Sequence, residues 1–225
     1  MSAALKLVLF DVDGTLIDSQ YAIVDAMNRA AGAAGLAQPT REATLSVVGL
    51  SLPEAIALLY PREHEVAQAA MVAAYKQAYM EARTQDGAPP FFPGALDTMR
   101  TLAARDEVFL GTATGMSRRG MTRIIESHDL GRLFATTQTA DDHPSKPHPA
   151  MVLAALRETG VAARDAVFVG DTAYDIEAGR AAGVFTIGVT WGYHAADRLR
   201  MAGAHDVIDS FDDLIPAIDR QWSAA

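Results

Sequence analysis

Several stretches of the chain carry nearly unbroken runs of apolar residues, which is the pattern of strands buried on both faces of a sheet. These runs lie at residues 5–12, 107–113, 165–170, 185–190 and, more weakly, 206–208, with a further short strand expected at 135–139. Apolar residues at helical spacing separate them, at residues 94–104, 117–128, 149–158, 172–182 and 195–202. Alternating strands and helices predict an α/β fold with a doubly wound, Rossmann-like parallel sheet covered on both faces.

The alternation stops over residues 17–92, where no convincing strand occurs. Apolar residues recur there at helical spacing, and Gly-Ala-Pro-Pro at residues 87–90 ends the pattern. We therefore expect an all-helical domain at residues 17–92, inserted into an α/β core formed by residues 1–16 and 93–225. The alternative is that these helices belong to the layers of the core itself.

Composition narrows the class of protein. With 225 residues the chain is long enough for one large domain, or for a domain with a smaller insert. It has no cysteine, which excludes disulfides and thiolate metal sites, and its net charge of −9 without a basic run argues against a nucleic-acid partner. The apolar run at its start is too short for a signal peptide or a membrane span, so we expect a cytoplasmic protein with no membrane partner. The composition does not specify an oligomeric state.

Polar residues follow the predicted strands at the edge where doubly wound sheets bind ligands. They are Asp11, Asp13, Gly14 and Thr15 after the first strand, Thr114 and Gly115 after the second, Asp171 and Asp175 after the third long one, and Lys146 in a Ser-Lys-Pro-His-Pro loop. If these edges converge, one site holds four carboxylates, a hydroxyl and an ammonium group.

Such a cluster is electrostatically unstable alone, because neighbouring carboxylates raise one another's pKa. A hard divalent cation resolves the conflict, and Mg²⁺ takes oxygen ligands and commonly completes its shell with substrate phosphate. A lysine suits phosphate as a point charge, and free amides at a helix start complete an anion cradle. The pattern thus predicts Mg²⁺ as the cofactor and a small phosphorylated metabolite as the partner.

Each of these residues also has an ordinary explanation when it is taken alone. Asp13 with Gly14 is a common turn signal, and Thr114 or Asp171 could cap a helix. Asp175 could be a solvated carboxylate in a first helical turn, and Lys146 a surface lysine. Four such features at four strand or loop edges, in this order, are much harder to explain separately.

The histidines are weaker signals. His143 and His148 flank Lys146, but histidine suits softer metals than Mg²⁺, so we expect both to be loop residues. The other histidines have no partner pattern and are expected at the surface; these are His64, His128, His194 and His205. The loop at residues 191–194 follows a strand and either lines the site or packs against it.

These motifs together resemble the haloacid dehalogenase superfamily, and within it the phosphoglycolate phosphatase-like hydrolases that carry a helical cap. Residues 10–19, FDVDGTLIDS, are similar to the first motif of that family, and residues 170–175, GDTAYD, to the fourth. Thr114 with Gly115 looks like the second motif and Lys146 like the third. The resemblance covers nearly the whole chain.

The resemblance implies a Mg²⁺-dependent phosphoric monoester hydrolase that works through an aspartyl-phosphate. Asp11 would be the nucleophile, and Asp13 the general acid and later the general base. Thr114, Gly115 and Lys146 would bind the phosphate, with Lys146 also neutralising the nucleophile. The helical insert would be the mobile cap that closes over a substrate such as phosphoglycolate or a sugar phosphate.

The same resemblance implies a metal site. Mg²⁺ would lie between the Asp11 carboxylate, the backbone carbonyl of Asp13 and Asp171, while Asp175 would support its water shell. One position departs from many relatives, which carry a polar residue or lysine where this chain has Met116. That departure bears on the substrate and not on the core chemistry.

Other functions stay open. A phosphomutase of the same superfamily would need the cap to grip a second anion, for which the candidates are Arg29, Arg41, Arg62 and Arg83. A haloacid dehalogenase uses the same nucleophile without Mg²⁺, but relatives of that type lack the second aspartate. The intact acidic motifs argue against a non-catalytic binding module. Residues 48–53 interrupt the insert and either read the substrate or only connect two helices.

Overall fold

The computed structural model describes residues 4–224, apart from the side chains of residues 85, 86 and 224. Six parallel strands form one sheet in the order β3-β2-β1-β4-β5-β6. They are β1 (Lys6–Phe10), β2 (Val108–Thr114), β3 (Thr136–Thr139), β4 (Ala166–Gly170), β5 (Phe185–Val189) and β6 (Asp206–Ile208). The chain winds outward from β1 in both directions, which confirms the predicted doubly wound α/β fold.

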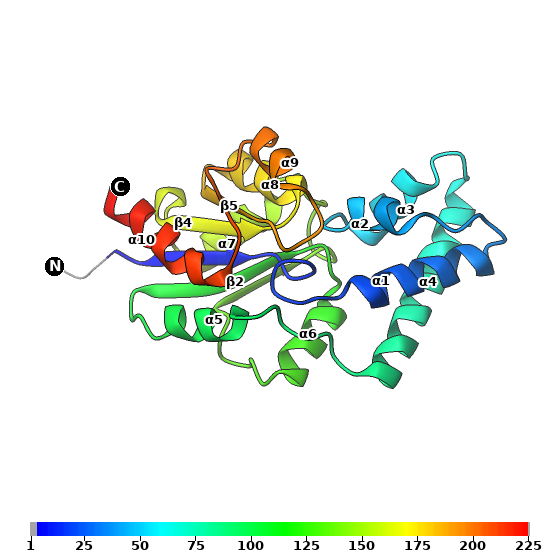
Figure 1. Ribbon diagram of the computed structural model, residues 1–225, viewed down its shortest axis with the longest axis horizontal. Helices are drawn as coiled ribbons and strands as arrows, with labels where there is room; N and C mark the ends of the chain where they lie inside the picture. Colours follow the sequence, from blue (N-terminus) through cyan, green and yellow to red (C-terminus); the bar gives the residue numbers. More distant parts are fainter. Residues whose placement is uncertain (1–3, 225) are drawn as a thin grey trace.

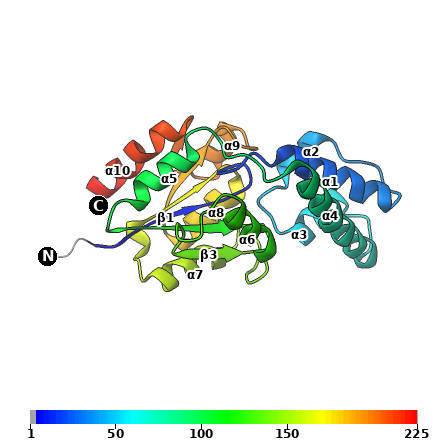
Figure 2. The same ribbon diagram turned by 90° about the horizontal axis from the view of Figure 1, so that it is seen from below.

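Helices cover both faces of the sheet, as Figure 1 and Figure 2 show. The helices that follow the insert are α5 (Ala95–Ala103), α6 (Arg118–Ser127), α7 (Ala150–Thr159), α8 (Ala173–Ala182), α9 (Ala196–Met201) and α10 (Leu214–Ala224). Successive residues of β1 point to opposite faces, so Leu7 and Leu9 pack with α7 and α8 while Val8 and Phe10 pack with α5, α6 and α10. The central strand is therefore buried on both sides, which explains its unbroken apolar run.

Capping residues fix where the helices beside the site begin. The Ser117 hydroxyl accepts a hydrogen bond from the Gly120 amide at the start of α6. The Thr172 hydroxyl accepts one from the Asp175 amide at the start of α8. Each of these contacts satisfies an amide that the helix itself leaves without a partner. The helix starts at the functional edge are therefore set by local side chains.

Only helices lie between β1 and α5, over a stretch whose backbone the structure describes throughout. They are α1 (Gln20–Ala33), α2 (Arg41–Ser46), α3 (Leu52–Leu59) and α4 (Glu65–Asp86). We call residues 17–92 the helical insert; Figure 1 shows it beyond the carboxyl ends of the strands. A hydrophobic cluster of its own, which includes Met27, Ile56 and Met71, holds these helices together separately from the two layers of the sheet.

The two connections between the insert and the sheet run side by side. Ile17 and Phe91 form an antiparallel bridge, and the Phe92 amide donates a hydrogen bond of 2.9 Å to the Leu16 carbonyl. This paired junction lies at the expected boundary, and the division into core and cap domains at residues 17 and 92 remains a proposal. Within residues 4–224, no helix combines the length and the apolar character needed to cross a bilayer.

Candidate active site

The predicted site residues meet at the carboxyl ends of β1, β2 and β4, which are neighbours at the centre of the sheet. Asp11 follows β1, Thr114 ends β2 and Asp171 follows β4. Lys146 reaches the same place from the loop between β3 and α7. Because the winding direction reverses beside β1, this is the switch point at which doubly wound sheets bind ligands.

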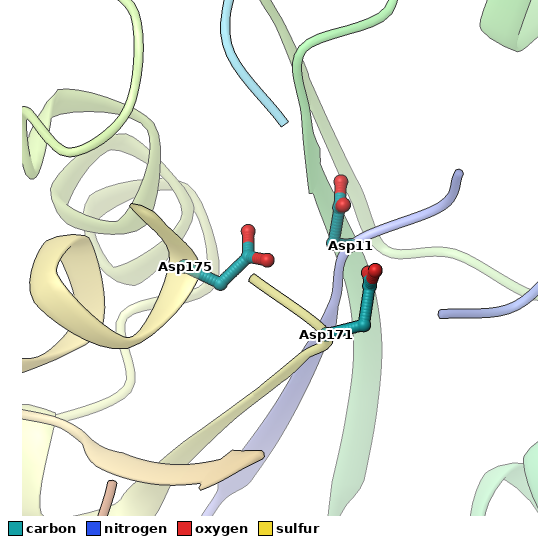
Figure 3. Close-up of side chains that lie close together, drawn as sticks. All are labelled: Asp11, Asp171 and Asp175. Carbon is teal, nitrogen blue, oxygen red and sulfur yellow. The ribbon is translucent and has the colours of Figure 1, made fainter. Parts of the chain in front are cut away.

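Three buried carboxylates form the centre of the site. Oxygen atoms of Asp11, Asp171 and Asp175 all lie within 4.8 Å of one another, and Figure 3 shows how they converge from β1, β4 and α8. None of the three side chains is more than 1% exposed. Burial raises the pKa of Asp11 well above its ordinary value, and burial together with Asp175 raises the pKa of Asp171 to about 7. The acidic cluster thus has a strong tendency to bind positive charge.

Lys146 supplies one such charge from within the protein. Its side chain is fully buried, and its ammonium nitrogen Nζ lies 2.6 Å from Asp175 Oδ1 and 2.9 Å from Asp11 Oδ1. It also donates a hydrogen bond of 3.2 Å to the Ala113 carbonyl. Although burial alone would lower the pKa of Lys146, the attraction of Asp11 and Asp175 holds it above its ordinary value. The interpretation of Lys146 as a surface lysine is therefore wrong.

The Asp175 carboxylate has two roles: it caps the start of α8 and it contacts Lys146 in the site. Its Oδ2 accepts hydrogen bonds from the Thr172 amide (3.0 Å) and the Thr172 hydroxyl (2.6 Å), which completes a capping box at α8. Its other oxygen faces Lys146. The carboxylate is fixed at both oxygens and fully buried, so it is not a solvated first-turn residue.

A second set of contacts fixes Asp171. Its Oδ1 accepts a hydrogen bond of 2.7 Å from the Thr15 hydroxyl, and its Oδ2 accepts one of 2.9 Å from the Tyr193 amide. The loop at residues 191–194 therefore packs against the site, and the Trp191 indole donates to the Thr15 carbonyl at 3.0 Å. The sequence placed this loop at the functional edge but gave no signal for these individual contacts.

The expectation of a surface position for His194 is wrong, because the residue is only 3% exposed. Its Nδ1 accepts a hydrogen bond of 2.9 Å from the Ala173 amide, and its Nε2 lies 3.1 Å from the Ser46 carbonyl of the insert. Burial lowers the pKa of His194, so the neutral ring donates through Nε2. The imidazole thus joins the start of α8 to the insert, a contact that residue spacing does not reveal.

The charges and oxygen atoms of the cluster fit a hard divalent cation. Three carboxylates face one ammonium group, so the fully ionised cluster has two uncompensated negative charges. Asp11 Oδ2 is buried and has no hydrogen-bond partner among the described residues. An all-oxygen donor set of this kind suits Mg²⁺, and Asp11, Asp171 and Asp175 could hold it.

Asp13 occupies a different environment from the other three acids. Its carboxylate is absent from the cluster and instead accepts a hydrogen bond of 2.5 Å from the Ser19 hydroxyl. Burial raises the pKa of Asp13 above its ordinary value. A contribution from Asp13 to a metal would therefore come through its backbone carbonyl, as the resemblance implies, which leaves its side chain free for proton transfer.

The end of β2 lies directly against the insert. The Thr114 hydroxyl accepts a hydrogen bond of 3.2 Å from the Met116 amide, which shapes the turn after the strand. A Cβ atom on Gly115 would lie 2.5 Å from the Leu50 carbonyl oxygen and 2.9 Å from that of Gly49. Only glycine allows the insert to approach so closely, so the loop at residues 48–53 is part of the site's wall and not a remote connection.

A cavity of about 390 Å³ opens between this edge and the insert. Asp13, Gly115 and Met116 contribute from the core, and α1, α3, α4 and the loop at residues 48–53 contribute from the insert. Of the four arginines considered for a second anion site, only Arg83 lines it. Arg29 forms an ion pair with Glu81, and Arg41 donates a hydrogen bond to Gln20.

Comparisons with known proteins agree with this geometry. Residues 8–189 match the family described as haloacid dehalogenase-like hydrolase. The protein named "Probable phosphatase IndB" of Dickeya dadantii is 33% identical over 94% of this chain and 92% of its own length. "Phosphoglycolate phosphatase 1" of Pseudomonas aeruginosa is 30% identical over 96% of this chain and 80% of its own length.

A solved structure supports the fold independently. The crystal structure of a predicted phosphatase from Clostridium acetobutylicum superposes with a TM-score of 0.85. The match covers 97% of this chain and all of that one, at 24% sequence identity. The similarity at this level of identity concerns the architecture, a parallel sheet with its helices, and extends over the insert as well as the core.

Proposed function

The chain belongs to the haloacid dehalogenase-like hydrolases and is a phosphoric monoester hydrolase, and we propose that it cleaves small phosphomonoesters in two steps through an aspartyl-phosphate on Asp11. The observation that carries this proposal is the environment of Asp11. Its Oδ2 is buried and has no hydrogen-bond partner among the described residues, while Lys146 lies beside its Oδ1. An oxygen held in this way is suited to attack phosphorus.

In the first step Asp11 attacks the phosphorus atom, and the bond between phosphorus and the ester oxygen breaks. Asp13 gives its proton to the departing alcohol. This role is supported by the pKa of Asp13, which burial raises, and by the separation of its carboxylate from the acidic cluster. In the second step water attacks the phosphorus, Asp13 takes up the proton, and Asp11 and inorganic phosphate are released.

Lys146 and the turn after β2 position the phosphoryl group. Lys146 balances the charge of the nucleophile and of the transferring group, and its two carboxylate contacts hold it in place. Thr114 and the amides that follow it are assigned to the phosphate oxygens. Phosphoryl transfer depends mainly on such positioning and charge neutralisation.

We assign Mg²⁺ to the acidic cluster. The proposed ligands are the carboxylates of Asp11 and Asp171 and the backbone carbonyl of Asp13, with Asp175 supporting the metal-bound waters. When bound, the ion neutralises charge on the phosphoryl oxygens and orients them. Thr15 and the Tyr193 amide hold Asp171 in the orientation that this role needs.

The helical insert is proposed to act as a cap that covers the substrate and excludes water from the first step. Its loop at residues 48–53 is in contact with the core, where the Ser51 amide donates a hydrogen bond of 2.8 Å to the Ser145 hydroxyl. Ser145 precedes Lys146, so the cap meets the catalytic edge at its lysine. Opening and closing of such elements commonly gates access to an active site.

The proposed substrates are phosphoglycolate-like esters or sugar phosphates. A phosphomutase is the second candidate, favoured by Arg83 in the cavity, where it could hold a second anion. A cytoplasmic location remains a prediction from the sequence.

The test is release of inorganic phosphate from a panel of phosphate esters, with Mg²⁺ and after chelation. A phosphatase releases phosphate and alcohol in equal amounts, whereas a mutase returns an isomer of the substrate. Turnover that survives exhaustive chelation would exclude the metal-dependent mechanism. Hydrolysis of 2-chloropropionate in place of phosphate esters would indicate a dehalogenase.

A further inference from the structure

The lining of the cavity is rich in positive charge. Its cationic side chains are Lys76, Arg83, Arg119 and Arg123. The lining contains two acidic side chains, Asp13 and Asp141. This excess of positive charge occurs in a chain whose net charge is −9, so it is a local feature and not a consequence of composition.

None of these four cations forms an ion pair with any residue whose side chain the structure describes. Lys76 and Arg119 are exposed, and water can solvate them. Arg83 is different, because its Nη1 is buried and has no hydrogen-bond partner among the described side chains and backbone groups. A buried donor left without a partner costs free energy, which a ligand that accepts its hydrogen bond would recover.

A second buried donor lies on the same helix, one turn earlier. The Tyr79 hydroxyl is also buried and has no partner among the described residues. Its ring stacks on Tyr75, with centroids 5.8 Å apart and planes 11° apart, which holds the hydroxyl in place. Two adjacent turns of α4 therefore present a guanidinium and a phenol to one cavity, both in need of an acceptor.

Much of the rest of the cavity wall is apolar. Ile23, Met27, Val47, Met80 and Met116 line it, together with the two tyrosine rings. Side chains of this kind contact hydrocarbon or an aromatic ring, and a cavity of about 390 Å³ lies within the range of ~300–1,000 Å³ that is typical of small-molecule sites. The two-carbon leaving group of phosphoglycolate is anionic but too small to contact these side chains, so the cavity favours a larger member of the proposed phosphoglycolate-like esters.

We propose that the leaving group of the natural ester combines an apolar body with an anionic group, a carboxylate or a second phosphate, and that Arg83 and Tyr79 bind this anion. The inference rests on the proposed phosphatase function and names the class of its substrate. Acidic and basic groups are arranged in sequence along the site: the acidic cluster holds the metal and phosphate, Asp13 stands at the ester oxygen, and Arg83 receives the far end of the leaving group.

Matched pairs of esters test this assignment. The 3- and 4-carboxyphenyl phosphates are compared with the corresponding carbamoylphenyl phosphates, which have nearly the same shape but no second charge. The phenylene bisphosphates form a third arm that separates a carboxylate from a phosphate. We expect the preferred anionic ester to exceed its carbamoyl partner in kcat/KM by at least about tenfold, the effect of one charge-assisted hydrogen bond.

Variants assign that preference to particular side chains. In Arg83→Gln the ratio of the anionic to the neutral ester should fall close to one, and in Arg83→Lys part of it should return. Tyr79→Phe keeps the ring packing and should lower the ratio by about threefold. This variant tests the subsite even if an Arg83 variant does not fold. The control Arg62→Gln removes the same charge from an exposed residue of the insert outside the cavity lining and should leave the ratio unchanged.

The ratio distinguishes substrate binding from a general electrostatic effect. Arg83 also lowers the pKa of Asp13 slightly, so its loss could slow every ester, but that effect cancels in the ratio. Equal rates for both members of each pair in the wild-type protein, or equal losses in the Arg83 variants, would overturn the subsite and leave the phosphatase function standing. A protein that hydrolyses no ester with Mg²⁺ would overturn the proposed function and the subsite with it.

Discussion

The two sides of the active site, which we call the sheet-edge wall and the insert wall, differ in how their polar groups are satisfied. At the sheet edge Lys146 and Asp175 are fully buried and contact each other at 2.6 Å, and Asp171 has two donors of its own. On the insert side, buried polar atoms of Arg83 and Tyr79 have no partner among the described residues. At the sheet edge most of the polar groups are paired within the protein and Asp11 Oδ2 is left for the reacting group, whereas the insert side leaves donors for a ligand.

This difference separates the chemistry from the choice of substrate. A buried network of ion pairs and hydrogen bonds, such as that around Lys146, is rigid, and removal of one member leaves the others unpaired. Donors without partners cost free energy until a substrate arrives, and so they favour esters that satisfy them. The sheet edge would then perform the same reaction on many esters, while the insert would decide which ester is used.

The largest effect should follow from breaking the chemistry at the sheet edge. Asp11→Asn keeps the volume of the side chain but removes the nucleophile, so we expect turnover to fall on the order of 10⁴-fold or more. The substitution also relieves repulsion among three buried carboxylates, so the melting temperature should stay equal or rise. Phosphate release measures the loss of turnover, and thermal unfolding measures the melting temperature. Residual activity of more than a few per cent would remove Asp11 from the covalent role.

The next effect concerns stability. Lys146→Met keeps most of the length of the side chain but leaves Asp11 and Asp175 without their counter-charge, and the free energy of unfolding should fall by about 3–5 kcal/mol. The control Lys76→Met removes an exposed lysine from the opposite wall and should cost less than about 0.5 kcal/mol. Urea denaturation gives the free energy of unfolding of both variants and of the wild-type protein. Equal costs for the two substitutions would contradict the contrast between the walls.

Removal of Mg²⁺ should reveal the strain in the acidic cluster. In the metal-free protein the pKa of Asp171 is about 7, raised above the ordinary value of 3.8, so between these values the folded state binds a proton that the unfolded state has lost. Stability should therefore fall as pH rises through this window, by roughly a few kcal/mol at most. Saturating Mg²⁺ should largely remove the fall, and Asp171→Asn should reduce it, because Asp11 and Asp13, whose pKa values burial also raises, remain. Thermal unfolding from pH 5 to 8, with and without Mg²⁺, measures this dependence of stability on pH. A metal-free protein that is equally stable at every pH in this range would contradict the prediction.

The smallest effect tests the contact between the two walls. Gly49 has φ +98° and Gly35 has φ +70°, so alanine at either position is strained by about 1–2 kcal/mol. A Cβ on Gly49 would also lie 2.9 Å from the Thr172 hydroxyl oxygen, whereas a Cβ on Gly35 meets nothing within 4 Å. Gly49→Ala should lower kcat/KM roughly tenfold through poorer closure, and Gly35→Ala should leave it unchanged. Equal activity of the two variants would show that the loop only connects helices.

The sheet-edge wall was largely predictable from the sequence, and the reason is physical. Strands that are buried on both faces consist of consecutive apolar residues, so they can be recognised in the sequence. The carboxyl ends of parallel strands lie at one edge of the sheet, and the sequence therefore places Asp11, Asp171 and Lys146 close together. The helical character of the insert was equally visible from its spacing.

What could not be predicted depends on how loops fold back in space. The burial of His194 arises from hydrogen bonds to Ala173 and Ser46, which are 21 and 148 residues away in the chain. The selection of Arg83 from four similar arginines, which lie on different elements of the insert, depends on which of those elements bring an arginine to the cavity. Neither fact has a local pattern of residues behind it, because long-range packing decides both.

The covalent intermediate is the most direct test of the account. The protein is mixed with Mg²⁺ and p-nitrophenyl phosphate, whose leaving group needs little protonation, then quenched in acid during turnover, digested and examined by mass spectrometry. Asp13→Asn is treated in the same way, and in this variant the second step should be slowed more than the first. The account predicts a mass increase of one phosphoryl group on Asp11 in both proteins, with a larger fraction in the variant. A phosphoryl group on another residue, or none in either protein while phosphate is being released, would contradict it.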